Sequence, residues 1–228
     1  MLLTMSYTPL IRPIFRLPTT IPIPNIGGGG TGYIAITPDG TKAYFLNNGQ
    51  INILSIPSYA ITGTIVPPGS LTSPLGIAFT PDGATAYVAY LAGGGGNFGG
   101  VITINVQNST FSGTVSDSSG TFLSPSFIAI TPAIITPTKV YVTNRQAGHP
   151  VSVVEGDAVI AQVSGGTINT CNGIAITPNG LTAYVVNGSM VNTIEVTSNV
   201  VHRYGEWRYV CYPLFYSDYP QWHHRVCD

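Results

Sequence analysis

One phrase of the sequence occurs four times, and this repetition constrains the fold more than any other feature. "GYIAITPDGTKAYFLNN" at residues 32–48 returns as "LGIAFTPDGATAYVAY" at 75–90 and as "NGIAITPNGLTAYVVNG" at 172–188. A weaker copy, "FIAITPAIITPTKVYVTN", lies at 127–144. Units of about 40 to 50 residues are typical of four-stranded propeller blades and of helical HEAT-type repeats. The choice between these two depends on the local chemistry of each copy.

That chemistry favours strands. In the first copy the apolar Ile34 and Ile36 alternate with Ala35 and Thr37, which is the period of two of a half-buried strand. β-branched residues are abundant, and Gly or Pro interrupts the chain every ten residues or so, which leaves no uninterrupted stretch for a helix. Each unit therefore predicts four strands joined by three turns.

The Thr-Pro-Asp-Gly element predicts a tight turn between the first two strands of a unit. Proline presets φ near −65°, aspartate or asparagine tolerates the third place, and glycine accepts a left-handed backbone. The predicted turn residues are Pro38, Asp39, Gly40, Pro81, Asp82, Gly83, Pro178, Asn179 and Gly180. The third copy carries "TPAIITPT" instead and is three residues longer, which predicts a longer hairpin.

An alanine occupies the same place on the first strand of every unit. These residues are Ala35, Ala78, Ala129 and Ala175. Since the innermost strands of a propeller converge on its axis, we expect crowding to select a small side chain there.

The motif "KVYVTN" at 139–144, together with "IAITPDGTKAY" and "IAITPNGLTAYVVN", resembles the YVTN-type β-propeller repeat. The resemblance covers residues 19–200. It implies a family whose members commonly carry seven blades, occur on bacterial and archaeal surfaces or in the periplasm, and serve mostly as binding or scaffold modules. An extracellular, cell-surface or periplasmic location is expected on this ground alone, because the N-terminus shows no recognisable signal peptide.

The sequence therefore predicts an all-β propeller of about four consecutive four-stranded blades over residues 19–200, in an incomplete ring. Residues 1–18 are expected to be irregular, with an orphan outer strand starting at Thr19. Residues 201–228 are compositionally foreign, with both tryptophans and three of the four histidines. They predict either a C-terminal cap or, as the favoured hypothesis, a frameshifted reading. An incomplete ring exposes the faces of its end blades, which predicts a homo-oligomer or blades missing from a longer chain.

Composition excludes several function classes. Charged residues make up 7% of the chain and the net charge is −1, so no basic surplus exists to track nucleic-acid phosphates. No apolar stretch is long enough for a membrane-spanning helix. The glycines at 27, 29 and 32, and those at 94, 96 and 99, match a dinucleotide fingerprint, but both runs lead into strands rather than a helix. No cofactor is predicted.

No catalytic residue is predicted either. His149 is the only histidine before residue 201, and no Gly-x-Ser-x-Gly element occurs. Weak candidates for a metal site lie in the C-terminal segment, namely Cys211, His223, His224 and Cys227. Two thiols and two imidazoles suit zinc, but the spacing does not match paired zinc ligands, and a Cys211–Cys227 disulfide is an alternative.

The expected function is a non-catalytic binding or scaffold module that contacts a protein, glycan or surface partner through uncharged, Thr- and Asn-rich blade loops. One alternative is a lactonase-like hydrolytic propeller, which would need carboxylates and a histidine clustered at the central mouth. Another is a truncated or frameshifted fragment of a larger propeller, without independent activity.

Overall fold

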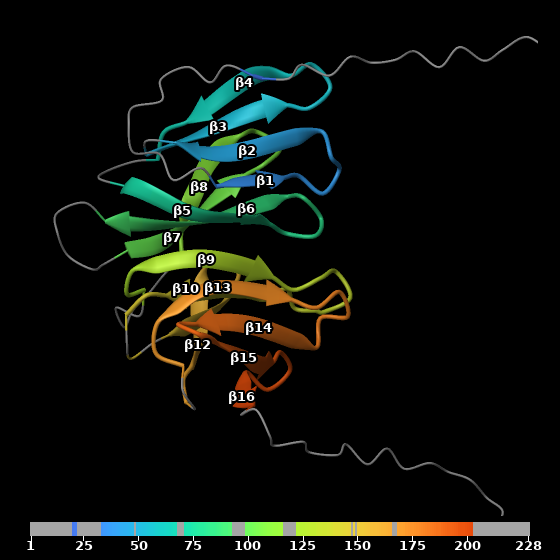
Figure 1. The fold of residues 1–228 in the computed structure, drawn as a ribbon. Helices are drawn as coiled ribbons and strands as arrows, with labels where there is room; N and C mark the ends of the chain where they lie inside the picture. Colours follow the sequence, from blue (N-terminus) through green and yellow to red (C-terminus); the bar gives the residue numbers. More distant parts are fainter. Residues whose placement is uncertain are drawn as a thin grey trace, which may run out of the picture.

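The computed structural model describes residues 20–21, 33–47, 49–67, 71–92, 99–115, 122–146, 148, 150–165 and 168–202. Within these ranges the chain forms sixteen β-strands and no helix. The strands make four antiparallel sheets of four strands each, so the predicted all-β fold and the predicted number of blades are confirmed (Figure 1).

Each blade is a simple meander in which strands adjacent in the chain are adjacent in the sheet. The first blade contains β1 (Ile34–Ile36), β2 (Lys42–Asn47), β3 (Gln50–Ser55) and β4 (Ala60–Ile65). The second contains β5 (Leu71–Phe79), β6 (Thr85–Ala92), β7 (Gly99–Asn105) and β8 (Thr110–Thr114). The third contains β9 (Pro125–Ile130), β10 (Val140–Asn144), β11 (Val151–Glu155) and β12 (Ala158–Val163). The fourth contains β13 (Cys171–Ile176), β14 (Thr182–Asn187), β15 (Met190–Glu195) and β16 (Val200–His202).

The repeated phrase sets the register of every blade. The repeat alanine of the first strand pairs directly with the repeat tyrosine of the second strand in all four sheets. The pairs are Ala35 with Tyr44, Ala78 with Tyr87, Ala129 with Tyr141, and Ala175 with Tyr184. In the third blade the connection between the paired residues is three residues longer than in the others, which confirms the predicted longer hairpin.

The blades are arranged around an axis formed by their first strands. β1 contacts β5, β5 contacts β9, and β9 contacts β13. Tyr33, next to β1, packs edge-on against Phe127 of β9 with ring centroids 5.3 Å apart, so the first and third blades also meet near the axis. The first and fourth blades lie at opposite ends of the array, and the ring is open (Figure 1).

The repeat alanines differ in exposure. Ala175, in the fourth blade, is exposed, and the alanines of the other three blades are partly buried. The expectation that crowding selects a small side chain at these places stays a prediction.

The hydrophobic core lies between the blades rather than within one of them. We call the side of a blade that carries the repeat tyrosine its forward face, and the opposite side its rear face. The forward face of the first blade, with Tyr44, Leu46 and Ile53, packs on the rear face of the second, with Val88 and Ile102. Two further clusters join the second blade to the third and the third to the fourth in the same way.

Several sequence predictions lie outside the described residues. These are the irregular segment 1–18, the orphan strand except for residues 20 and 21, His149, and the metal candidates Cys211, His223, His224 and Cys227. β16 begins at Val200, where the last strand of the fourth repeat is due, and runs to His202. Two residues of the compositionally foreign segment are therefore part of the fourth blade. In the part of the chain that the structure describes, no helix is long and apolar enough to cross a membrane.

Candidate functional site

We call the connection between the first and second strands of a blade its inner turn, and in the first blade this turn is built around the hydrogen-bonded Asp39. In the first blade the Thr37 hydroxyl donates to Asp39 Oδ1 at 2.6 Å, and the Thr41 amide and hydroxyl donate to the two Asp39 oxygens at 3.0 and 2.8 Å. Gly40 has a φ of 70°, a left-handed value that a side chain would strain. The carboxylate therefore holds its own turn together.

The inner turns of the second and fourth blades repeat this geometry. Thr80 donates to Asp82, and Thr177 donates to Asn179, both at 2.6 Å. Gly83 and Gly180 have φ values of 70° and 69°. Because an amide oxygen replaces the carboxylate in the fourth blade without changing the turn, this place requires a hydrogen-bond acceptor and not a charge.

Hydrogen bonding fixes the protonation state of the two aspartates. The Thr37 hydroxyl, followed by the amide and hydroxyl of Thr41, lowers the pKa of Asp39 to about 2. The Thr80 hydroxyl and the Ala84 amide likewise lower the pKa of Asp82 below its ordinary value. A general acid needs a raised carboxyl pKa, so the lowered pKa values make these two carboxyl groups poor general acids.

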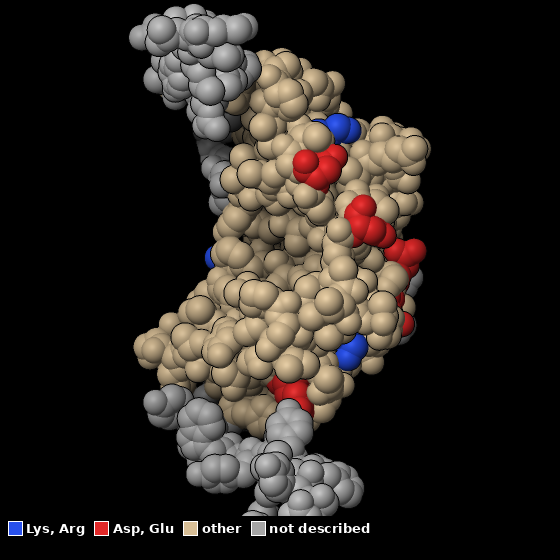
Figure 2. Space-filling model, turned by 90° about the vertical axis from the view of Figure 1, so that its right-hand side faces the viewer, with Lys and Arg blue, Asp and Glu red and all other residues tan. Residues whose placement is uncertain are grey.

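All inner turns lie at the same end of the blades as the β3–β4-type connections, and we call this end the turn face. Figure 2 looks onto it and shows isolated acidic and basic groups around an uncharged hollow. A cleft of about 340 Å³ opens between the inner turns of the first two blades, where Asp39, Lys42 and Asp82 meet the amides of Asn105 and Gln107. Both carboxylates in this cleft are the hydrogen-bonded turn residues.

The longer hairpin of the third blade brings apolar side chains to the turn face. Ile135 packs onto the inner turn of the fourth blade so closely that a Cβ on Gly180 would lie 2.3 Å from Ile135 Cγ1. Beside this contact, Ile134 is 69% exposed and Leu181 is 50% exposed. Two large aliphatic side chains thus face solvent on two hairpins that touch each other.

The repeat tyrosines join the blades through their hydroxyl groups. Tyr87 donates to the Gly156 carbonyl of the third blade at 3.0 Å. Tyr141 donates to the Val196 carbonyl of the fourth blade at 3.1 Å and also contacts Asn199 Oδ1. We call this arrangement the tyrosine–turn contact, because the acceptor always lies in the connection between the third and fourth strands of the next blade, its outer turn.

The first and last blades differ in this contact. The hydroxyl of Tyr44 is hydrogen-bonded to the Ser109 hydroxyl in the outer turn of the second blade at 3.2 Å. Tyr184 of the fourth blade is 46% exposed, and no further blade follows it within the described residues. The sequence marks these tyrosines as a repeat signature, but it does not reveal their acceptors, which are distant in the chain and are partly backbone carbonyls.

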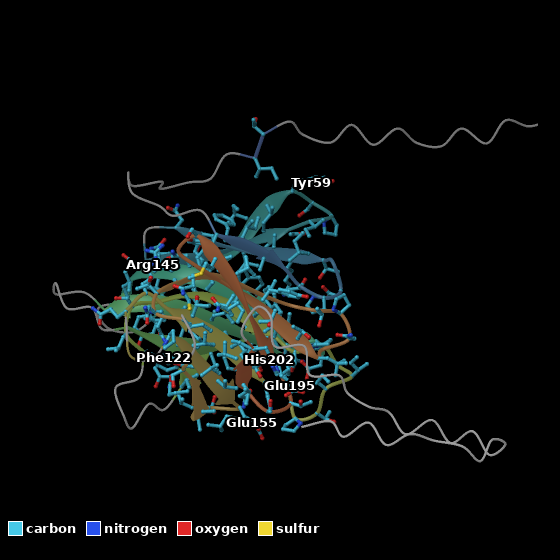
Figure 3. All side chains as sticks on the ribbon, turned by 60° about the horizontal axis from the view of Figure 1, so that its bottom comes forward. Tyr59, Phe122, Arg145, Glu155, Glu195 and His202 are labelled. Carbon is cyan, nitrogen blue, oxygen red and sulfur yellow. The ribbon has the colours of Figure 1, made fainter. Side chains whose placement is uncertain are left out.

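The other reactive side chains form no larger cluster in the described part of the chain. Cys171 is buried without a disulfide partner among the described residues, and burial raises the pKa of its thiol to about 12. Glu195 and His202 lie side by side at the edge of the fourth blade, 3.8 Å apart, as Figure 3 shows. Within the described ranges no three His, Cys, Asp or Glu side chains come together as metal ligands would.

Comparison with known proteins supports the fold but no particular family or function. Among 741 solved chains of similar structure is Kuenenia stuttgartiensis hydrazine synthase, with a TM-score of 0.62 and 20% sequence identity. The similarity covers 75% of this chain and 47% of that chain, so this protein corresponds to about half the length of its structural neighbour. Neither a scan against protein families nor a search of curated sequences gives a match. The comparisons therefore establish a shared arrangement of β-blades.

Proposed function

We propose that this chain is a non-catalytic β-propeller module that binds a protein partner through the hairpins of its turn face. The observation that carries the proposal is the pair Ile134 and Leu181, which are exposed on two hairpins held together by Ile135 and Gly180. Large apolar side chains on a fixed backbone are typical of the centre of protein interfaces.

The surroundings of this pair support the proposal. The turn residues next to it satisfy their own hydrogen bonds, as Thr177 does with Asn179 and with the Thr182 carbonyl. A surface whose polar groups are already paired loses little on desolvation, and a rigid surface loses little conformational freedom when it binds. A YVTN-type family membership and a surface or periplasmic location form part of the same proposal, supported by the phrases that recur in the sequence.

The hydrolytic alternative has less support. The carboxylates of the turn face, Asp39 and Asp82, each accept hydrogen bonds from their own turn and have lowered pKa values. No histidine lies beside them within the described residues. A panel of lactones incubated with the wild-type chain and with Asp39→Asn is expected to show no enzyme-dependent hydrolysis by either protein.

The test of binding uses paired surface variants. Double replacement Ile134→Ser and Leu181→Ser removes the apolar pair, while Ile160→Ser changes an isoleucine that is 48% exposed on the outer strand β12. Partners captured from the source organism would be identified, purified and titrated by calorimetry against all three proteins. We expect the double variant to bind its partner at least about tenfold more weakly than the wild type, which corresponds to a loss of about 1.4 kcal/mol of binding free energy. The control is expected to bind as the wild type does. Equal affinities, or binding on a glycan array in place of any protein partner, would contradict the proposal.

A further inference from the structure

We propose that the junction between the first and second blades binds a neutral oligosaccharide. The site is formed by two adjoining clefts, which together we call the junction groove. The inference goes beyond the proposed function, because Ile134 and Leu181, which carry that proposal, lie at the inner turns of the third and fourth blades. The two ligands use different blades, so either one can be found without the other.

Two clefts lie side by side at this junction. The first, of about 340 Å³, lies between the inner turns of the two blades and contains the carboxylates of Asp39 and Asp82. The second, of about 380 Å³, extends from the inner turn of the first blade to the outer strand β4, where Gly63 lines it. Thr41 and Lys42 line both clefts, so the clefts adjoin. Each has the volume of a small-molecule site, which begins at roughly 300 Å³.

A glycine on the outer strand keeps the second cleft open. In the first blade Tyr44 pairs with Ile53, and Ile53 pairs with Gly63, so all three lie on the forward face. A Cβ built on Gly63 would meet Ile53 Cδ1 at 3.5 Å and no other described atom within 4 Å. On the opposite side, Ser109 from the outer turn of the second blade is hydrogen-bonded to the Tyr44 hydroxyl at 3.2 Å. The second cleft is therefore a preformed space between two blades that are bonded to each other.

The backbone amides that line the groove are already hydrogen-bonded within the blades. The Thr41 amide donates to Asp39 Oδ1 at 3.0 Å. The Ala84 amide donates to Asp82 Oδ1 at 2.9 Å, and the Val106 amide donates to the Ala84 carbonyl at 3.0 Å. An extended peptide that adds to a sheet binds mainly through main-chain hydrogen bonds, and these donors are not available to it. We therefore expect side chains to recognise the ligand.

The side chains of the groove keep both acceptors and donors for a ligand. Asp82 accepts its two turn hydrogen bonds on Oδ1, at 2.6 and 2.9 Å, so Oδ2 remains an acceptor. Asn105 Oδ1 accepts from the Asn108 amide at 3.0 Å, so Asn105 Nδ2 remains a donor. The ammonium group of Lys42 is a further donor. Because a hydroxyl group both donates and accepts, a ligand with several neighbouring hydroxyl groups can satisfy this mixed set.

Charge and apolar surface favour an uncharged ligand of this kind. Hydrogen bonding lowers the pKa values of Asp39 and Asp82, so both are ionised, and Lys42 beside them is a cation. An anionic ligand would lie against two carboxylates, and a cationic ligand would lie against the Lys42 ammonium group. Ile53 and Pro57 add apolar surface to the second cleft, against which the C–H groups of a sugar ring can pack. A neutral oligosaccharide combines hydroxyl groups with such C–H surfaces.

The first experiment presents the fluorescently labelled full chain to an array of neutral, acidic and amino-sugar oligosaccharides. We expect the array to retain the chain on neutral oligosaccharides. Each of these is then titrated into the isotope-labelled chain and followed by NMR. The amide resonances of Gly63, Ala84 and Val106 should shift, while that of Leu181 should not. An array on which no neutral oligosaccharide binds, or shifts confined to other blades, would overturn the proposal.

Filling the second cleft tests whether it is part of the site. Gly63→Val places a β-branched side chain in the cleft, and Gly63 has no positive φ, so the strand accepts valine without backbone strain. The matched control is Gly113→Val on β8, where a Cβ would likewise meet its strand neighbour, Thr103 Oγ1, at 3.5 Å. We expect Gly63→Val to bind the oligosaccharide at least about tenfold more weakly and Gly113→Val to bind as the wild type does. Circular dichroism checks that both variants keep their strands, and equal affinities would contradict the proposal.

Asp82→Asn changes the first cleft and leaves its turn intact. Asn179 forms the same turn in the fourth blade, where its Oδ1 accepts from the Thr177 hydroxyl at 2.6 Å and the Leu181 amide at 3.1 Å. In the variant Oδ1 keeps this role, so an amide donor takes the place of the Oδ2 acceptor. We expect roughly tenfold weaker binding, and unchanged binding by the reverse control Asn179→Asp. Binding that is insensitive to Asp82→Asn would refute the role given to this carboxylate.

Ionic strength separates an oligosaccharide from a basic peptide. The affinity for a neutral ligand should be the same at low and high salt, because no ion pair forms. A lysine- or arginine-containing peptide that displaces the oligosaccharide, with an affinity that falls steeply as salt is added, would assign the groove to a protein and overturn the proposal. The partner of the turn face is tested separately by the Ile134→Ser and Leu181→Ser double variant, so a failure there leaves the junction groove unaffected.

Discussion

Replacing Tyr141 by phenylalanine tests the tyrosine–turn contact with minimal change in shape. The side chain is fully buried, and its hydroxyl donates to the Val196 carbonyl and contacts Asn199 Oδ1. Lys139 Nζ also donates to the Val196 carbonyl at 3.1 Å, so that acceptor keeps one donor in the variant. Leaving a buried polar group unsatisfied costs about 1 to 3 kcal/mol, and with one acceptor partly compensated we expect the free energy of unfolding to fall by about 1.5 kcal/mol.

The other repeat tyrosines provide a graded series. Tyr87→Phe removes a single hydrogen bond to Gly156 in a solvent-accessible turn, so we expect a loss of about 1 kcal/mol. Tyr44→Phe should cost about 0.5 kcal/mol, because its partner Ser109 can donate to the Val106 carbonyl instead. Tyr184→Phe should change the free energy of unfolding by less than about 0.5 kcal/mol, since an exposed hydroxyl remains hydrated.

Urea unfolding followed by circular dichroism measures these differences. The reasoning requires the order Tyr141, Tyr87, Tyr44, Tyr184. A Tyr184→Phe loss as large as that of Tyr141→Phe would refute it, because the effect would then come from the sheet itself and not from the neighbouring blade.

Three further predictions concern the turns and the core. The pKa of Asp39 is about 2 in the folded chain, below its ordinary value of 3.8. The ionised carboxylate therefore contributes fully to the stability of the fold above about pH 4, and this contribution is lost as the pH falls through about 2. An NMR titration of Asp39 with a midpoint near 4 would contradict this. Gly180→Ala should lower the free energy of unfolding, measured in urea, by about 1 kcal/mol more than Gly40→Ala does. Both glycines have a positive φ, but only a Cβ at position 180 would collide with Ile135. Equal losses of stability in the two variants would contradict this steric argument. Cys171 should resist alkylation in the native chain and react after unfolding, as read by peptide mass spectrometry, and rapid labelling of the native thiol would disprove its burial.

The parts of the fold that sequence predicts well are governed by local chemistry. The Thr-Pro-Asp-Gly turns and the alternation of Ile34 and Ile36 specify a hairpin within about a dozen residues, so the strand register follows from the phrase itself. The three-residue insertion before Tyr141 changes the hairpin length and leaves the pairing of Ala129 unchanged. The number of copies of the phrase then predicts the number of blades.

The candidate sites depend on contacts between residues that are far apart in the sequence, and local sequence patterns do not predict such contacts. Tyr87 and Gly156 are separated by 69 residues, and the acceptor is a backbone carbonyl, which no side chain signals. Ile134 could have been suspected, since two adjacent isoleucines interrupt an otherwise polar turn, but its exposure depends on how Ile135 meets the fourth blade.

The tyrosine–turn contact gives the array a direction, and this direction bears on how such a chain can evolve. At each of the three junctions the preceding blade supplies a tyrosine and the following blade receives it in its outer turn, so every junction is made from the same two halves. A gene that gains or loses one whole unit by unequal recombination creates no junction of a new kind. The number of blades can therefore drift during descent while the chemistry that joins neighbours stays the same.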